Sequence, residues 1–257
     1  MVYINFSEAE VYLNHTLLFG YPSLLVVGKN GIGKTELLRT MIAKSKRCRY
    51  VSNIDYGGLK QQIALAYSNK QDIIAIPDLK NIIMRKRTVS ESTLGYMSSL
   101  MSEGIMSNMS YSKDMELDEG KEKKKKIINF IIPATKVHLA VLIRQQQYDF
   151  LNRFLILEVE RSNKEWKPEK FELNAPYVKK YNKDIYRSYV NTRFKGLSPR
   201  FNTMLNNLAR GLVSMGVDYK DLINKSKPLV FDPDMYIDLN KVDFKLRVLD
   251  TVEDTED

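Results

Sequence analysis

Strand-like and helix-like patterns of hydrophobic and polar positions alternate along this chain. Short apolar runs occupy residues 23–27, 72–76 and 127–132, and turn-forming residues follow each of them. Such runs are typical of strands that are buried on both faces of a parallel sheet. The pattern predicts two more strands, at 49–52 and within 148–159, and therefore a parallel sheet of five strands.

Helical stretches separate these strands. In the stretch 59–68, Leu59, Ile63 and Ala66 are spaced to share one face of a helix. Residues 1–22 show no clear period, and we interpret them as a short lead-in too small to form a domain. Further helices are expected at 36–44, 93–104, 176–193 and 199–215, with a helix or loop at 137–146.

The segment 199–215 has the strongest helical signature. Ser198 is a natural N-cap, Pro199 suits the first turn, and Gly216 is placed to end the helix. Arg200 falls in the first turn, away from the apolar face. A cation there opposes the helix dipole, which suits contact with a phosphate better than it suits stability.

Composition narrows the class of protein. Among 257 residues, 44% are hydrophobic and 28% are charged, as in soluble globular proteins. The single cysteine, Cys48, excludes an intramolecular disulfide framework and is compatible with a reducing compartment. No run of about 18 apolar residues occurs, and no basic stretch leads into a long apolar one. We therefore expect a cytoplasmic protein without a membrane partner.

The net charge favours anionic partners. The chain carries 40 Lys and Arg against 31 Asp and Glu, a formal charge of +9. Nucleic acid is the leading candidate, although a proteome that is basic throughout would give the same balance. Lys113–Lys126 contains a lysine run before the strand at 127–132 and is interpreted as a hairpin that meets DNA phosphates. The alternative is a solvated, partly disordered loop.

The residues from Gly28 to Thr35 match G-x-x-x-x-G-K-[ST], the phosphate-binding loop known as Walker A. A predicted strand precedes the loop and a predicted helix follows it, as that loop requires. Glycines let successive backbone N–H groups turn inward around a phosphate, and the helix dipole adds positive charge. The expected contacts to ATP come from Gly28, Asn30, Gly31, Ile32 and Gly33.

Lys34 and Thr35 complete the loop. Lys34 would reach the β- and γ-phosphates, and the Thr35 hydroxyl would bind Mg²⁺. Asp78 follows the apolar run at 72–76 and is the candidate Walker B aspartate, a second magnesium ligand. A turn aspartate is the alternative. Leu79 stands where many ATPases of this type carry a glutamate. Three alternatives follow from this difference. Hydrolysis is slow, another acid such as Glu91 activates the attacking water, or the protein uses nucleotide binding mainly as a switch.

Two further candidate site residues lie at the ends of predicted strands. Thr135 follows the strand at 127–132, where its hydroxyl could orient water beside the γ-phosphate, the role called sensor 1. Arg153 comes just before the fifth strand. Arg153 either contacts a phosphate of ATP, or it caps a helix or forms a local ion pair.

Four stretches resemble AAA+ ATPases, in the branch that has a hairpin before sensor 1 and includes the MoxR ATPases and the minichromosome maintenance helicases. Together they lie within roughly residues 20–225. They are Gly28–Thr35, Tyr96–Met106, Leu151–Phe154, and Gly196–Phe201 with Asn207–Ala209 and Asp218–Leu222.

The resemblance implies an α/β fold: a P-loop NTPase three-layer αβα sandwich with a parallel five-stranded sheet and a small α-helical lid domain. It divides the chain into a nucleotide-binding core at 1–165, a lid with sensor 2 at 166–226 and a C-terminal extension with an acidic tail at 227–257. It also implies an ATP site between subunits, with Arg200 on the lid and Arg153 donated to the neighbouring subunit.

The function implied is an oligomeric ATPase, a ring or filament, that uses ATP and Mg²⁺ for work on DNA such as replication, unwinding or packaging in a mobile element. The first alternative is a MoxR-like chaperone that remodels a protein partner. The second is a nucleotide-dependent switch that hydrolyses ATP slowly. We do not expect an autonomous replicative helicase, because residues 1–22 contain no DNA-binding or zinc domain of the kind that helicases of this branch carry.

Overall fold

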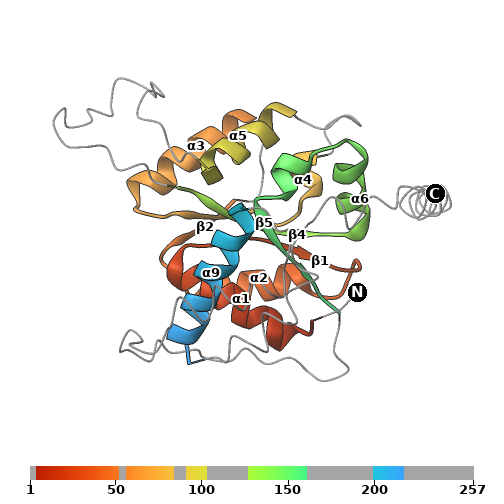
Figure 1. Ribbon diagram of the computed structural model, residues 1–257. Coiled ribbons are helices and arrows are strands. Elements are labelled where there is room, and N and C mark those ends of the chain that lie inside the picture. Colours follow the sequence, from red (N-terminus) through yellow and green to blue (C-terminus); the bar gives the residue numbers. More distant parts are fainter. Residues whose placement is uncertain (1–3, 52–55, 84–90, 103–126, 161–198, 217–257) are drawn as a thin grey trace.

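The computed structural model describes residues 4–51, 56–83, 91–102, 127–160 and 199–216. They form a five-stranded sheet in the order β2-β3-β4-β1-β5 (Figure 1). Every neighbouring pair of strands is parallel. The strands are β1 (Ser23–Val27), β2 (Cys48–Tyr50), β3 (Ile73–Ala75), β4 (Asn129–Ala134) and β5 (Phe154–Glu158). The predicted parallel sheet of five strands is confirmed.

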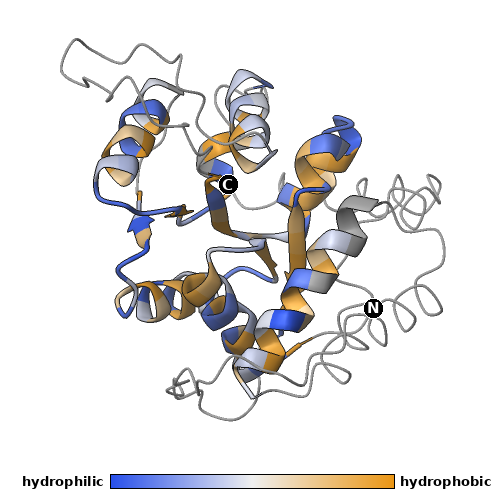
Figure 2. Cartoon of the chain, turned by 60° about the vertical axis from the view of Figure 1, so that its left-hand side comes forward, coloured by the Kyte–Doolittle hydropathy of each residue, from blue (hydrophilic) through white to orange (hydrophobic). Residues whose placement is uncertain are grey.

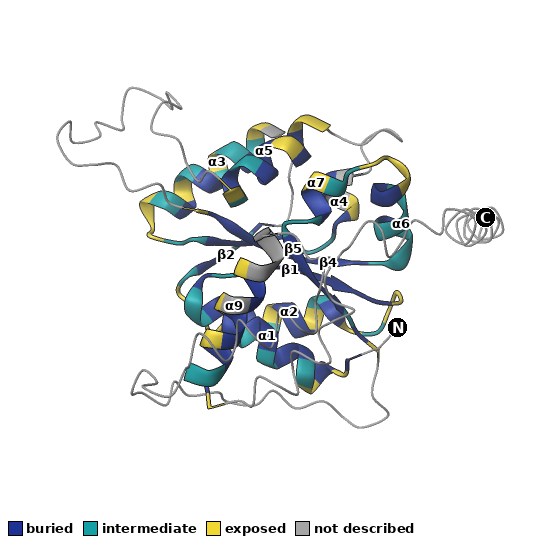
Figure 3. Cartoon of the chain, viewed as in Figure 1, coloured by how far each residue is buried: buried dark blue, intermediate teal, exposed yellow. Residues whose placement is uncertain are grey.

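Helices cover both faces of this sheet, as Figures 1 and 3 show. Within the described ranges, no helix is both long enough and apolar enough to cross a bilayer. The helices are α1 (Phe6–Phe19), α2 (Lys34–Ile42), α3 (Tyr56–Ser68), α4 (Lys80–Ile83), α5 (Glu91–Ser102), α6 (Lys136–Arg144), α7 (Tyr148–Leu151) and α9 (Pro199–Ser214).

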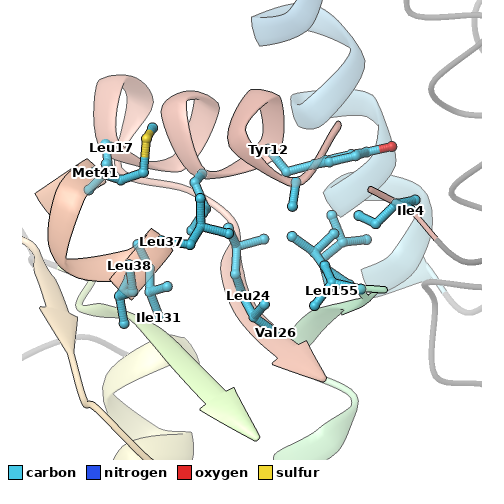
Figure 4. Packing of buried hydrophobic residues seen from close by; sticks show 14 of the residues in the cluster. Ile4, Tyr12, Leu17, Leu24, Val26, Leu37, Leu38, Met41, Ile131 and Leu155 are labelled. Atoms are coloured by element: carbon cyan, nitrogen blue, oxygen red, sulfur yellow. The ribbon is translucent and has the colours of Figure 1, made fainter. Parts of the chain in front are cut away.

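Alternation along the strands builds two hydrophobic clusters, one on each face. In β1, Leu24 and Val26 pack with α1, α2 and α9, whereas Leu25 and Val27 belong to the cluster formed with α3 to α7. Figure 4 shows the first cluster at close range, and Figure 2 shows hydrophobic residues concentrated along the strands. Because both faces are covered, the strands read as continuous apolar runs in the sequence.

Residues 6–19, within the stretch interpreted as a short lead-in, form helix α1, which the sequence analysis did not predict. A capping box begins it: Glu8 N–H donates to Asn5 Oδ1 at 2.9 Å, and Asn5 N–H donates to Glu8 Oε2 at 3.0 Å. Gly20 ends it in the left-handed conformation, at φ 74°. Polar residues on the buried side of α1, among them Glu10 and Thr16, break the apolar period.

Helix α9 packs against the same face of the sheet as α1 and α2. Its buried residues Leu205, Leu208 and Leu212 lie in one cluster with residues of α1 and β1. Gly211 allows the close approach, because a Cβ there would lie 1.9 Å from His15 Nε2. Most of the predicted lid lies outside the described residues, so the division into three domains stays a prediction.

Candidate functional site

The loop after β1 is held in a conformation that depends on glycine. Gly31 has φ 73° and Gly33 has φ 96°, in the left-handed region that other residues avoid. Gly33 is the N-cap of α2 and offers no side chain to bond the first N–H groups of that helix. These N–H groups and the helix dipole therefore remain available to an anion in front of α2.

Gly28 lies at a close approach between the loop and the end of β5. Its N–H donates to Ala134 O at 3.1 Å, which ties the loop to β4. A Cβ at this position would lie 2.6 Å from Val159 O and 2.7 Å from Ile32 Cδ1. Glycine is therefore required here by space, whereas it is required at Gly31 and Gly33 by backbone conformation.

The Lys34 ammonium lies against the loop itself. Its Nζ donates to Gly28 O at 2.8 Å and to Lys29 O at 2.6 Å, and the residue is buried. Burial lowers the pKa of Lys34, and the charge of Asp78 opposes that shift. The loop thus holds a cation at the position where a phosphate-binding lysine is needed.

A pocket of about 340 Å³ opens at the carboxyl ends of β1, β3 and β4. This volume falls at the lower end of the range for small-molecule sites, roughly 300–1,000 Å³. Its lining brings together most of the residues that the sequence predicted: Asn30, Gly31, Gly33, Lys34, Thr35, Asp78 and Thr135, with Glu36, Arg39, Pro77, Pro133 and Ala134. Gly28 and Ile32 belong to the same loop but are not among the residues that line the pocket.

Asp78 lies in a turn and also lines the pocket. Strand β3 ends at Ala75, and Asp78 follows in a turn where its Oδ1 accepts from Lys80 N–H at 2.9 Å. Its side chain is 46% exposed and lines the pocket. Nearby, Thr35 Oγ1 lies 3.4 Å from Pro77 O. A turn aspartate and a carboxylate beside the phosphate-binding loop are thus the same residue.

Thr135 is the N-cap of α6 and faces the same pocket. Its Oγ1 accepts from His138 N–H at 3.2 Å. The sequence analysis missed His138, whose Nδ1 lies 3.4 Å from Asp78 Oδ1. The spacing Thr-x-x-His after a predicted strand is the signal that could have drawn attention to it, because N-cap and N3 residues pair.

The position after Asp78 supplies no acid to the pocket. Leu79 is fully buried and packs in the cluster with α3 and α5. Glu91, the alternative acid named from the sequence, begins α5 and is exposed. It is not among the residues that line the pocket, whose described acids are Asp78 and Glu36.

Arg153 lies near the amino ends of the strands, whereas the pocket opens at their carboxyl ends. It precedes β5, whose first residue, Phe154, pairs with Ser23 at the start of β1, whereas the loop follows the end of β1. At 3.3 Å per residue, the length of β1 separates the two by roughly 15 Å. Its Nη2 donates to both oxygens of Asp149, at 2.8 and 3.0 Å. In its own chain Arg153 therefore pairs locally.

Two predicted features lie outside the described residues. Arg200 belongs by its backbone to the first turn of α9, but the description does not extend to its side chain. The hairpin Lys113–Lys126 falls in a stretch that is not described at all. Their roles toward ATP and DNA stay predictions.

No protein-family model, no curated protein and no solved structure matches this chain. The resemblance to AAA+ ATPases therefore rests on the four stretches of sequence alone. The geometry of the pocket is an argument independent of that resemblance, because it follows from the loop, the sheet and the side chains at its edge.

Proposed function

We propose that this chain is a P-loop ATPase of the AAA+ type that binds Mg·ATP in the pocket after β1. One observation carries the proposal: the Walker A loop, the Lys34 ammonium, the Thr35 hydroxyl and the Asp78 carboxylate come together at one edge of a parallel sheet. Ligands of open α/β sheets bind at the carboxyl ends of the strands, beside a helix N-terminus.

Different groups of this chain would bind different parts of a triphosphate. The N–H groups of the loop and of the first turn of α2 would donate hydrogen bonds to the phosphate oxygens. Lys34 would exchange its contacts with Gly28 O and Lys29 O for phosphate, a partner of opposite charge. Thr135, whose Oγ1 already accepts from His138 N–H, keeps its own O–H free to donate toward the γ-phosphate or an attacking water.

The donor set fits magnesium. Mg²⁺ prefers oxygen ligands and is commonly held by one or two protein oxygens together with substrate phosphates and water. Thr35 Oγ1 and an Asp78 oxygen line the pocket and would hold it. No cluster of three or more His, Cys, Asp or Glu suited to a metal occurs in the described part of the chain, in keeping with a site completed by the nucleotide. When bound, Mg²⁺ neutralises charge that develops on the phosphates.

Hydrolysis would depend on assembly. Arg153 does not line the pocket of its own chain, so it could stabilise the transition state only in a neighbouring subunit. Its partner Asp149 is 69% exposed, whereas the Arg153 side chain is only 12% exposed, so Arg153 would have to become more accessible to meet a phosphate across an interface. A ring or filament is the assembly we propose.

The net charge of +9 and the lysine run at Lys113–Lys126 support DNA as the substrate on which this ATPase works. A chaperone acting on a protein partner is the alternative within the same fold. ATP turnover measured with and without single- and double-stranded DNA at moderate salt separates the two. Stimulation by DNA supports the first, and turnover that is indifferent to DNA rejects it.

A slow nucleotide switch is the second candidate, favoured by one observation. Leu79 is buried in the position where a glutamate would otherwise activate water, so the pocket lacks that acid. Sizing the protein by light scattering with and without a non-hydrolysable ATP analogue tests this function. A switch changes its assembly with bound nucleotide while turnover stays slow, whereas a motor turns over rapidly once assembled on its substrate.

A further inference from the structure

The ring of His138 lies between two residues of the nucleotide pocket that come from different loops. Asp78 follows β3 and Thr135 follows β4. His138 Nδ1 lies 3.4 Å from Asp78 Oδ1 and accepts from Thr135 N–H at 3.4 Å. The backbone N–H of His138 donates to Thr135 Oγ1 at 3.2 Å. One residue thus contacts both the magnesium-side carboxylate and the residue in the sensor 1 position.

The imidazole is fixed in this place. His138 is 8% exposed and occupies the N3 position of α6, where Glu or Gln usually closes a capping box. The loop after β3 is also tied to β4 itself, because Leu79 N–H donates to Pro133 O at 2.9 Å. The ring therefore cannot swing away from Asp78 without opening the cap of α6.

The chemistry of the ring links its two partners. Nδ1 carries either one lone pair or one hydrogen, so it can accept from Thr135 N–H or donate to Asp78, but not both at once. Asp78 Oδ1 takes the contacts from both Lys80 N–H and His138, which leaves Oδ2 to a cation. The ring therefore contacts the magnesium-side carboxylate and is anchored through Thr135.

We propose that His138 is a positioning residue of the magnesium site: it holds the Asp78 carboxylate for the cation from a place that Thr135 fixes. The inference deepens the proposed function and rests on it. Partners that orient metal ligands commonly change metal affinity or activity by about 10–100-fold when they are removed. His138 touches neither phosphate nor metal in this scheme and acts through Asp78 and Thr135.

The chain offers an internal control, because it has only two histidines. His15 lies against α9, at the far end of α1 from the phosphate-binding loop. Proton-carbon NMR of the imidazoles should show one signal set from each histidine, and His138→Asn identifies which set is which. Mg²⁺ added to protein with a non-hydrolysable ATP analogue should move the His138 signals and leave those of His15 in place. In Asp78→Asn the movement should largely disappear.

Variants give the second test. A fluorescent ATP analogue is titrated first without Mg²⁺ and then at increasing Mg²⁺. His138→Leu should raise the Mg²⁺ concentration for half-saturation about tenfold, while affinity without Mg²⁺ stays unchanged. His138→Asn should stay close to the wild type, because an amide atom on Cγ takes the place of Nδ1. If His138→Leu does not fold, the NMR experiment on the wild type still decides.

The outcomes separate the two proposals. Wild-type protein that does not bind the nucleotide overturns the proposed function and this inference with it. Wild-type protein that binds, with the Mg²⁺ requirement of His138→Leu unchanged and only its thermal stability lowered, makes His138 a helix cap and overturns the inference alone. His138 NMR signals that do not move when Mg²⁺ is added also overturn the inference.

Discussion

Replacing Gly28 by alanine tests the close approach that shapes the phosphate-binding loop. The added Cβ would lie 2.6 Å from Val159 O, about 0.8 Å short of the 3.4 Å at which ordinary contact begins. Val159 O is a backbone atom just after β5, and the N–H of Val159 donates to Val27 O at 2.8 Å, so this carbonyl cannot move aside cheaply. The loop must shift, and overpacking of this kind costs about 1–3 kcal/mol.

The shift should also damage the site. Gly28 O is one of the two carbonyls that hold Lys34 Nζ, so its displacement moves the ammonium as well. We expect Gly28→Ala to lower the midpoint of thermal unfolding by about 2–4 °C for each kcal/mol lost and to weaken binding of a fluorescent ATP analogue.

Gly31→Ala is the matched control in the same loop. A Cβ at Gly31 meets nothing within 4 Å, so this change costs only the left-handed backbone, about 1–2 kcal/mol. Thermal unfolding by calorimetry and binding of the fluorescent ATP analogue should be measured for both variants. A Gly28→Ala protein with unchanged thermal stability would refute the steric argument.

Three further predictions follow from the same structure. Gly95→Ala, inside α5 where a Cβ meets nothing, should stabilise the protein by about 0.5–1 kcal/mol in urea unfolding. Gly211→Ala, whose Cβ would meet His15, should destabilise it, and the reverse order would contradict the packing of α9. Burial lowers the pKa of His15 from 6.5 to about 4, so the unfolded chain binds a proton that the folded chain does not. Stability should therefore fall by up to about 3 kcal/mol as the pH drops from 6.5 to 4, and a His15→Gln protein with the same pH dependence would refute this. Arg153→Ala should abolish most turnover while nucleotide affinity is kept, and Asp149→Ala should not; unaltered turnover in Arg153→Ala would exclude its action on a neighbour.

Much of the fold could be predicted because its signals are local. The apolar run at 23–27 is continuous because β1 buries alternate residues on opposite faces of the sheet. The glycine spacing of the loop after it reflects backbone conformations at Gly31 and Gly33 that other residues rarely adopt. Both features are visible in a few consecutive residues, without knowledge of the rest of the chain.

Helix α1 could not be predicted from periodicity, because its buried side carries polar residues. Glu10, His15 and Thr16 are all buried, and Thr16 Oγ1 donates to Pro22 O at 2.9 Å. Their burial depends on partners from other segments, which an apolar pattern does not reveal. The capping pair Asn5 and Glu8 was the local signal available.

Several residues that line the pocket could be named from the sequence, but the contacts among them could not. Lys34 and Thr35 follow from the motif, whereas the contact of His138 with Asp78 joins loops that are remote in sequence. Arg153 was assigned to a neighbour from resemblance, and its pairing with Asp149 within the chain arises from i,i+4 proximity at the end of α7.

The central claim is that the loop after β1 binds Mg·ATP, and isothermal titration calorimetry of purified protein tests it most directly. Lys34→Ala should weaken binding by roughly 10–100-fold, because a charge-assisted hydrogen bond contributes about 1.5–3 kcal/mol. Lys29→Ala, in the same loop with an exposed side chain and an unchanged backbone carbonyl, should bind as the wild type does. Wild-type protein that takes up no Mg·ATP, or Lys34→Ala that binds it equally well, would contradict the account.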